Sequence, residues 1–479
     1  MHLRKALEGL ALNPALPEAA VRRLIAFGGG LGELGRRQDL TPALVGEMID
    51  TGGHWLLHSL ALNPVLPHAA RLRLAGHPDA AVRAALALRA APDTTRAVFE
   101  LLLADAEPTT REHLAQNDGV PPDLRERLAA DPSAVVRATL GRWWPHAPEH
   151  VRRALLTDED DDVRAKACAT YYAAHPHPTH PPDLVPALLA DPVTRAGAVR
   201  CADLDAETAE RLAGDPDWEV RAQLARHPRL PARVRDVLGE DPCAEVRLGV
   251  FAREDTPDPV RAAIHAWIEA APHPLDLDGG LDDEALELAL VRSVAGIELH
   301  TMRLDWVMAD PLPHIGSPYR GFRASAAASR EPLPPQVVAR LLADDDSEVR
   351  AQMARRAPHL VDVETAERIE REFRPAKQTR WRPADVLSFP PEVLRRFATD
   401  PDPRMRCLAP RDPDLPAALA AGLAEDPDPT VRREVAGHPT LPVASLIALL
   451  DDERTARAAA ASPWLPAEQV ERLLALGGL

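Results

Sequence analysis

The sequence predicts an all-α protein built as a solenoid of two-helix repeats, each about 25 residues long. Two recurring phrases predict it: one begins with Asp-Pro and ends with arginine, and the other, Asn-Pro or His-Pro followed by Leu-Pro, comes after it. The chain has 49 prolines in 479 residues, about twice the ordinary share of ~5%. Two prolines in every repeat account for that excess.

The first phrase sets the repeat length. Its clearest copies are DPSAVVRATL from Asp131, DPDWEVRAQL from Asp215, DPCAEVRLGV from Asp241 and DPDPTVRREV from Asp426. Looser copies begin at His77, Asp158, Asp344, Asp400 and Asp451. The closing arginines are Arg83, Arg137, Arg164, Arg221, Arg247, Arg350, Arg406, Arg432 and Arg457. Most neighbours in this series are separated by one or two units of about 25 to 28 residues.

Each copy of this phrase predicts the start of a helix. We expect the aspartate to cap the helix and the proline to occupy its first position, where a missing N–H costs nothing. In the copy from Asp215, the apolar residues Val220, Leu224 and Ala225 recur three and four apart. This spacing places them on one buried stripe of a helix of about ten residues.

The second phrase predicts the end of that helix and the start of a shorter one. The residue before a proline is driven away from helical angles, so His-Pro or Asn-Pro stops the first helix. After Leu230 and Pro231, we expect Val234, Val237 and Leu238 to face the same core. Helices this short are marginal alone, so each repeat must gain its stability by stacking on its neighbours.

The recurring arginines, six residues after the aspartate, allow two interpretations. They form a ligand-binding row along one face, or they pair with an acidic residue of the adjoining repeat. The second is favoured for a position repeated in every unit, as a stack of partly exposed ion pairs worth up to ~1 kcal/mol each. Arg137, Arg221, Arg247 and Arg432, with Asp131, Asp215, Asp241 and Asp426, are therefore interpreted as structural.

The two phrases at this spacing resemble the leucine-rich repeat variant family, which is related in style to HEAT and armadillo solenoids. The resemblance covers most of residues 1–270 and 331–479. It implies a right-handed superhelix in which an α-helix alternates with a shorter, often 3₁₀, helix. The founding member also holds an iron-sulfur cluster on N-terminal cysteines. No cysteine precedes Cys168 in this chain, so we expect no such cofactor.

The pattern divides the chain into an N-terminal solenoid over 1–270, an irregular insertion over 271–335 and a C-terminal solenoid over 336–479. The insertion contains an acidic loop at 276–283, one longer helix at 284–299 and a turn region at 312–322. Other irregular stretches are 28–53, 171–182 and 373–389. Insertions in solenoids usually emerge on one face, often the binding face.

Composition limits the possible functions and surroundings. The net charge of −17 repels phosphate backbones, so nucleic acid is a disfavoured partner. Arginine far outnumbers lysine, which favours a GC-rich, bacterial coding bias. The four cysteines have neither disulfide-framework nor zinc spacing. No run approaches the ~18 apolar residues of a membrane span, and we expect a cytoplasmic protein.

Three short motifs invite a chemical interpretation that their context disfavours. Gly30, Gly32 and Gly35 form G-x-G-x-x-G, but a helical stretch precedes them, where a dinucleotide site requires a strand. His54 and His58 lie one helical turn apart, a spacing that can bind zinc, but Trp55 stands where a metalloprotease has Glu. We interpret the glycines as a loop and the histidines as packed or capping.

A histidine-rich loop leaves open whether a metal binds. His175, His177 and His180 are able to chelate a metal from the loop, but an extended, proline-rich linker is favoured there. No hydrolase or kinase motif appears. Asp282 and Asp283 are adjacent, so they cannot face one another across a substrate. The sequence therefore predicts neither a catalytic residue nor a metal site.

A non-catalytic protein-interaction scaffold is the favoured function, because curved solenoids present extended binding surfaces. Aromatic residues are only 4% of the chain, and aromatic residues with arginine are typical interface anchors. Five candidates for binding a partner protein or peptide follow: Trp306, Tyr319, Arg320, Arg323 and Trp381.

The alternative is a DNA-binding protein that resembles the HEAT-like DNA glycosylases. These enzymes use Trp, Asp and Arg against DNA, and Arg142 with Trp143 and Trp144, or Asp305 with Trp306, match that set of residue types. The acidity of the chain and the scarcity of lysine argue against this function.

Overall fold

The computed structural model is all-helical over the residues that it describes, as the sequence predicts. These residues are 2–27, 31–91, 93–169, 179–270, 283–375, 379 and 381–479, with the backbone alone for 283–290. They contain no β-strand. The chain divides into two compact units: residues 1–168 with 390–479 form unit 1, and residues 169–389 form unit 2. No described helix is both long enough and apolar enough to cross a bilayer.

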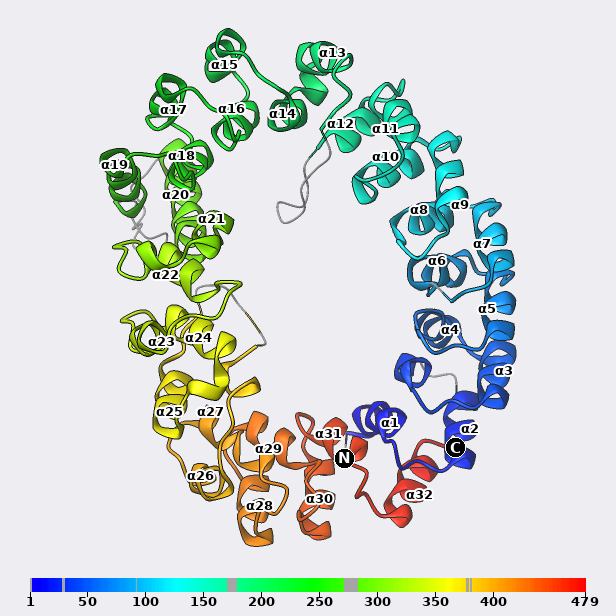
Figure 1. Ribbon diagram of the computed structural model, residues 1–479. Coiled ribbons are helices and arrows are strands. Elements are labelled where there is room, and N and C mark those ends of the chain that lie inside the picture. Colours follow the sequence, from blue (N-terminus) through cyan, green and yellow to red (C-terminus); the bar gives the residue numbers. More distant parts are fainter. Residues whose placement is uncertain are drawn as a thin grey trace. The chain divides into compact units, whose positions relative to one another are not determined.

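Unit 1 consists of two rows of short helices, each row formed by alternate elements of the chain (Figure 1). One row stacks α4 on α6, α8, α10 and α12, and the other stacks α3 on α5, α7 and α9. Its elements before residue 169 are α1 (Leu3–Leu12), α2 (Glu18–Phe27), η1 (Gly32–Arg36), α3 (Pro42–Thr51), α4 (His54–Ala61), α5 (His68–Ala75), α6 (Ala80–Arg89), α7 (Arg96–Leu103), α8 (Pro108–Gln116), α9 (Pro122–Glu126), η2 (Arg127–Ala130), α10 (Ala134–Trp143), α11 (Glu149–Leu156) and α12 (Asp161–Cys168). Its C-terminal elements are α26 (Pro391–Phe397), α27 (Pro403–Arg406), η7 (Ala409–Arg411), α28 (Ala417–Ala424), α29 (Pro429–Val435), α30 (Val443–Ala448), η8 (Leu449–Asp451), α31 (Ala456–Ala461) and α32 (Ala467–Leu476).

Unit 2 repeats this plan, with α14, α16 and α18 in one row and α15 and α17 in the other. Its elements are α13 (Val185–Ala190), α14 (Pro192–Cys201), α15 (Ala206–Ala213), α16 (Trp218–Ala225), α17 (Ala232–Leu238), α18 (Ala244–Phe251), α19 (Asp258–Glu269), α20 (Asp283–Thr301), α21 (Asp305–Ala309), η4 (Leu312–His314), α22 (Arg320–Ala327), α23 (Pro335–Leu342), α24 (Ser347–Arg356), η5 (Pro358–Leu360), α25 (Val363–Glu372) and η6 (Pro383–Asp385). Helix α22 packs on α24 as neighbouring repeats do. The irregular stretch expected over 271–335 therefore ends before residue 320.

The sequence predicts that the aspartate of the first phrase caps the helix, but in the structure it does not. Helix α16 begins at Trp218, and its N-cap is Asp217, whose side chain accepts from the backbone N–H of Glu219. Asp215 lies two residues before this cap, and its Oδ1 accepts from the N–H of Asp217 at 3.0 Å. The phrase aspartate thus forms a turn that leads into the helix, which leaves its other oxygen for a partner from another repeat.

The apolar stripe of α16 is buried as expected, but that of α17 is narrower than predicted. Val220 is 1% exposed, and Val234 and Leu238 are fully buried or nearly so. Val237, which was expected to face the core, is 57% exposed. Each residue turns a helix by about 100°, so Val237 points about 100° away from its buried neighbour Leu238 and lies outside the stripe that Val234 and Leu238 define.

The Asn or His of the second phrase has a role that the sequence analysis did not assign. The side-chain amide of Asn117 donates to the carbonyl oxygens of Ala87 and Ala90 in the preceding repeat, at 2.7 and 3.0 Å. His227 uses Nε2 in the same way toward Ala202 O, at 2.9 Å. This buried side chain therefore supplies donors to the C-terminal carbonyls of the preceding helix, which lack partners of their own.

For the first repeat of the chain, the last repeat occupies the position of the preceding one. Asn13 donates to Ala460 O and Ser462 O at 3.2 and 2.7 Å, just as Asn63 donates to Gly35 O and Arg37 O at 2.8 Å each. Helix α1 packs along α31, beside which it lies in Figure 1. Within unit 1, the terminal repeats are thus consecutive members of one stack.

Close approach and ion pairs reinforce this contact between the termini. A Cβ atom added to Gly9 of α1 would lie 2.2 Å from the carbonyl oxygen of Arg457, so only glycine fits there. Arg457 itself pairs with Glu33 at 3.0 Å, and Arg23 pairs with Glu471 at 2.5 Å. Each of these two terminal repeats therefore covers the face that the other presents to it.

Candidate binding surface

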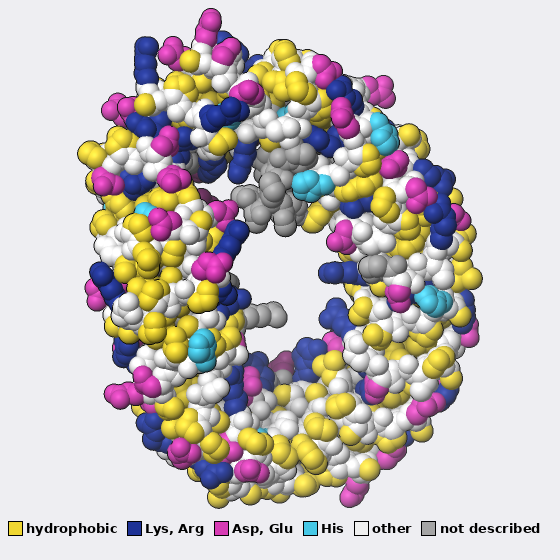
Figure 2. All heavy atoms as spheres, in the orientation of Figure 1, with side chains coloured by type: hydrophobic (Ala, Val, Ile, Leu, Met, Phe, Trp, Pro, Cys, Tyr) yellow, Lys and Arg dark blue, Asp and Glu magenta, His cyan; other side chains and the backbone are white. Residues whose placement is uncertain are grey.

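The phrase arginines form a ladder of ion pairs between successive repeats. The guanidinium of Arg137 donates to both carboxylate oxygens of Asp158, at 2.7 and 2.8 Å, and also to the backbone carbonyl of Asp131. These side chains are only 11% and 10% exposed. The other rungs are Arg83–Asp105, Arg111–Asp131, Arg195–Asp215, Arg221–Asp241, Arg323–Asp344, Arg350–Glu372, Arg406–Asp426 and Arg432–Asp452. Basic and acidic side chains are accordingly interspersed over the face shown in Figure 2.

Arg247 and Arg457 of the predicted series lie outside the ladder, and the described ion pair of Arg164 is with Asp161 of its own helix, at 2.6 Å. Arg247 donates to the carbonyls of Asp241 and Glu240, and its guanidinium lies 4.0 Å from the ring centre of Trp267. Burial lowers its pKa. Arg457 pairs with Glu33 of the first repeat, as described above. The ladder is thus broken at the long helices α19 and α20 and between the termini.

The arginines of three rungs, Arg111, Arg195 and Arg323, were missing from the predicted series because none has Asp-Pro starting six residues before it. Arg111 lies between Arg83 and Arg137, in a gap that equals two repeats, and Arg195 lies in the next double gap. A simpler signal exists, because each ladder arginine precedes its acidic partner by 20 to 22 residues. That spacing is common to the ladder pairs, although Arg247, outside the ladder, also has an acidic residue, Glu269, 22 positions later.

We predict that the rung at Arg137 contributes stability that disappears in acid. The hydrogen bonds from Arg137 lower the pKa of Asp158, so the rung stabilises the fold above the ordinary aspartate pKa of ~3.9 and is lost as pH falls through the lowered value. We expect Arg137→Gln to cost about 2 kcal/mol at pH 7, because it leaves a nearly buried carboxylate without its partner. Chemical denaturation at pH 7 and pH 3 measures both values.

The control for this rung is Arg4→Gln, which removes a side chain that is 85% exposed. We expect it to change the free energy of unfolding by less than about 0.5 kcal/mol at either pH. A loss for Arg137→Gln that stays the same at pH 3 would show that the missing interaction is packing and not the ion pair.

Three of the five expected partner-binding residues are engaged within unit 2. Tyr319 packs edge-on against Phe251, with ring centres 5.0 Å apart. Arg320 pairs with Asp346 at 3.1 Å, and Arg323 is the ladder partner of Asp344. Ser317 and Pro318 stand before Arg323 where other phrases have Asp-Pro. This segment is therefore a divergent copy of the first phrase, where the sequence predicts a turn region.

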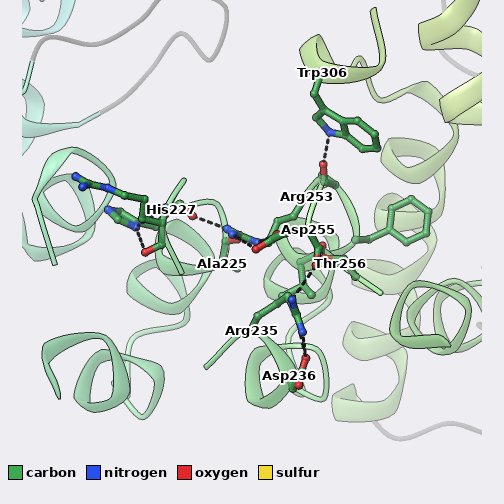
Figure 3. A network of polar contacts seen from close by, with 12 residues as sticks. Ala225, His227, Arg235, Asp236, Arg253, Asp255, Thr256 and Trp306 are labelled. Carbon is green, nitrogen blue, oxygen red and sulfur yellow. Dashed lines mark hydrogen bonds and ion pairs between the residues drawn. The ribbon is translucent and has the colours of Figure 1, made fainter. Parts of the chain in front are cut away.

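Trp306, in contrast, lines a pocket of about 610 Å³ together with Arg226, Gly249, Arg253 and other residues of the two preceding repeats. Its indole N–H donates to Ala252 O at 2.9 Å, which fixes the ring (Figure 3). In Figure 3, Arg253 bridges from Asp255 to the carbonyls of the preceding repeat, including Ala225 O. The pocket wall is therefore held by hydrogen bonds and ion pairs.

Trp381 lines a second pocket, of about 210 Å³, with Arg303, Gln352, Arg355 and Phe373 among its other residues. The tryptophan ring packs edge-on against Phe373, with ring centres 5.6 Å apart. The guanidinium of Arg355 lies 5.3 Å from the ring centre of Trp381, a cation–π distance. This pocket combines an aromatic wall with two arginines.

Arg226, Arg303 and Arg355 differ from ladder arginines because no described carboxylate pairs with them, whereas Arg253 of the Trp306 pocket pairs with Asp255. Arg226 donates only to Ala222 O, at 3.2 Å, and Arg303 donates to Gln352 Oε1, at 3.0 Å. Burial lowers the pKa of Arg226, and the charge of Arg200 lowers it further. Desolvation by its surroundings likewise lowers the pKa of Arg303, and Arg355 adds to this effect against the opposing charge of Glu348.

The sequence signal for these arginines is the absence of an acidic residue at the ladder spacing. Positions 20 to 22 residues after Arg226, Arg303 and Arg355 hold no Asp or Glu. Arg303, between α20 and α21, lines one pocket, and Trp306, in α21, lines the other. We call Arg226, Arg303, Trp306, Arg355 and Trp381 the arginine–tryptophan surface.

The glycine motif and the histidine pair have structural surroundings. Gly32 and Gly35 lie in η1, where a Cβ on Gly35 would come within 2.5 Å of the backbone N of Leu60 in α4. Gly30 lies outside the described residues. His54 pairs with Asp79 at 2.6 Å, and the rings of His54 and His58 have centres 6.2 Å apart.

The described residues include no group of three or more His, Cys, Asp or Glu side chains arranged to hold a metal. His175 and His177 lie outside the described residues, and His180 is 6% exposed. Among residues considered for DNA contact, Trp143 is 39% exposed, whereas the Trp144 ring lies 4.9 Å from the guanidinium of Arg125. Asp305 forms an exposed ion pair with Arg330 at 3.2 Å.

Solved structures with similarity to this chain include a leucine-rich repeat variant with a novel repetitive structural motif. Its TM-score is 0.18 at 20% identity, over 73% of this chain and 88% of that one. Kap121p bound to Nup53p gives a TM-score of 0.27 at 16% identity, and Kap121p bound to Pho4p gives 0.26 at 13%, each over 92% of this chain. The chain spans about half the length of the Kap121p chains, at 48% and 49%. No family model and no curated protein matches the sequence. At these TM-scores the likeness carries no conclusion about this chain.

Proposed function

We propose that this protein is a non-catalytic scaffold that binds a partner protein or peptide on the surface of its helical repeats. The observation that carries the proposal is the arginine–tryptophan surface, where two pockets of unit 2 each combine a tryptophan with arginine that no described carboxylate pairs with. Tryptophan and arginine are the residues most enriched among those that dominate the binding energy of protein interfaces.

Preorganisation of the surface supports the same function. Ladder ion pairs and the Asn, His or Arg side chains that bind the preceding repeat hold each helix in place. Trp306 is fixed by its bond to Ala252 O, so its ring loses little freedom when a partner binds. A surface that is rigid before association spends less binding free energy on ordering.

Site-specific photo-cross-linking tests the proposal. We expect a photoreactive phenylalanine analogue in place of Glu254, which lines the Trp306 pocket, to cross-link a partner in cells of the source organism. The same analogue at Val237, which is 57% exposed on α17, serves as the control. The purified partner should then bind the unmodified protein in calorimetry. Products at both positions, or none at position 254, would count against a partner on this surface.

A further inference from the structure

Most arginines of the repeats have a carboxylate partner, whereas those of the arginine–tryptophan surface have none among the described residues. Ladder arginines meet an Asp or Glu of the next repeat in a bidentate or single contact. The chain has 73 acidic residues against 56 basic ones, so carboxylates are plentiful. Unpaired guanidinium groups that lie side by side in such a chain are therefore a local feature of this surface and not a result of composition.

In the described part of the chain, the N–H donors of Arg303 and Arg355 outnumber their hydrogen bonds. A guanidinium carries five N–H donors. Within the described part of the chain, Arg303 makes one hydrogen bond, to Gln352 Oε1, and the recorded contact of Arg355 is with the Trp381 ring. The two side chains are exposed, so their remaining N–H groups face solvent. Their mutual repulsion contributes to the lowered pKa of Arg303. An oxyanion between them would accept these donors and remove the repulsion.

The shape of the pocket adds an apolar requirement. Phe373 and Trp381 form an aromatic wall beside the two arginines, within a pocket of about 210 Å³. Beyond the α20–α21 connection, Trp306 and Arg226 present the same combination in the larger pocket. A ligand that matches both pockets carries acidic groups next to apolar side chains, repeated along an extended segment.

We infer that the partner presents an acidic peptide segment, whose carboxylates bind Arg303 and Arg355 while an adjacent apolar side chain packs on Trp381. This inference rests on the proposed scaffold function and names the chemistry of its partner. Bidentate contact between guanidinium and carboxylate is the geometry that arginine favours, and the ladder of this protein uses it already.

A protein segment suits this surface better than a nucleic acid. The acidic side chains of Glu348 and Glu254 also line the two pockets, and the whole chain carries a net charge of −17. A phosphate backbone brings one charge per nucleotide to every part of such a surface. A short acidic peptide needs to place its carboxylates only beside the arginines.

Fluorescence anisotropy with a defined probe tests the inference. The probe is a fluorescein-labelled peptide of sequence Gly-Ser-Glu-Glu-Leu-Glu-Glu-Ser-Gly, compared with the same peptide in which Gln replaces Glu and with a labelled ten-residue oligothymidylate. We expect the acidic peptide to bind the full chain at ~50 mM salt and to weaken as salt rises, since screening acts on exposed charges. Binding of the oligothymidylate as tight as that of the peptide, or no binding of the peptide, would overturn the inference.

Matched variants locate the binding. We expect R303Q/R355Q to weaken the acidic peptide at least tenfold. The control R229Q/R233Q removes the same charge from side chains that are 75% and 82% exposed, and we expect it to change the affinity by less than twofold. Equal loss in both variants would mean that net charge alone attracts the peptide.

A thermal melt separates binding from a structural role. Because removing two neighbouring positive charges relieves repulsion, R303Q/R355Q should melt at or above the temperature of the wild type. A lower melting temperature would assign these arginines to the fold and overturn the inference. If the acidic peptide does not bind while cross-linking at position 254 still captures a partner, the scaffold function stands and the inference of an acidic partner segment is wrong. If the peptide does not bind and no partner is cross-linked, both proposals are wrong.

Discussion

Val220→Asp is expected to destabilise unit 2 more than any other single change considered for this protein. Val220 is 1% exposed in α16, between the helices of two neighbouring repeats. Aspartate there would be a charge without a partner in an apolar seam, which costs about 4 kcal/mol. For a unit of this size we expect the melting temperature to fall by roughly 10 °C, measured by calorimetry or circular dichroism.

The matched control is Val237→Asp, which introduces the same side chain on the next helix. Val237 is 57% exposed, so we expect a change within about 0.5 kcal/mol. The pattern of the sequence alone assigned both valines to the core and predicts two large effects. Similar melting temperatures for the two variants would contradict the stacking of the repeats described here.

Gly9→Ala is expected to separate the first repeat from the last. The added methyl group would lie 2.2 Å from Arg457 O and 2.8 Å from the Cβ atom of Ala460, so α1 and α31 must move apart. Overpacking of this kind costs about 1–3 kcal/mol. Hydrogen exchange should show faster exchange in both helices, because Asn13 also loses its bonds to the last repeat.

Gly422→Ala provides the control for this prediction. Gly422 lies in α28 of the same unit, and nothing lies within 4 Å of a Cβ atom added there. Alanine in an exposed helical position stabilises by about 0.5–1 kcal/mol relative to glycine. If Gly9→Ala also stabilised the protein, or if exchange in α31 were unchanged, the terminal repeats would not be consecutive members of the stack.

Local chemistry made the repeats predictable. Proline after Asn, His or Asp marks where a helix cannot continue, and a spacing of three and four apolar residues marks its buried stripe. Both signals act within a few residues, so helices such as α16 and α17 could be placed with little knowledge of their neighbours. The exact role of the phrase aspartate could not be predicted in this way, because the carboxylate of Asp215 also forms an ion pair with Arg195 of the preceding repeat.

The binding surface was only partly visible in the sequence. Scarcity of aromatic residues singled out Trp306 and Trp381, which both line pockets. The same reasoning selected Arg323, which the stack uses for its ladder, and it passed over Arg226, Arg303 and Arg355. Whether an arginine is paired depends on which residue of the next repeat lies opposite it, and that is decided when the repeats stack.

The sequence by itself determined the all-helical class, the repeat period, the helix boundaries to within a few residues and the positions of most ladder arginines. Only the tertiary structure decided that Asn13 binds the last repeat, that Val237 points outward and that a few arginines have no carboxylate partner in the described part of the chain. The physical reason is the separation in sequence over which each effect acts. Capping and proline effects act between neighbours in sequence, whereas the ladder pairs join residues at least 20 positions apart and the bonds of Asn13 join opposite ends of the chain.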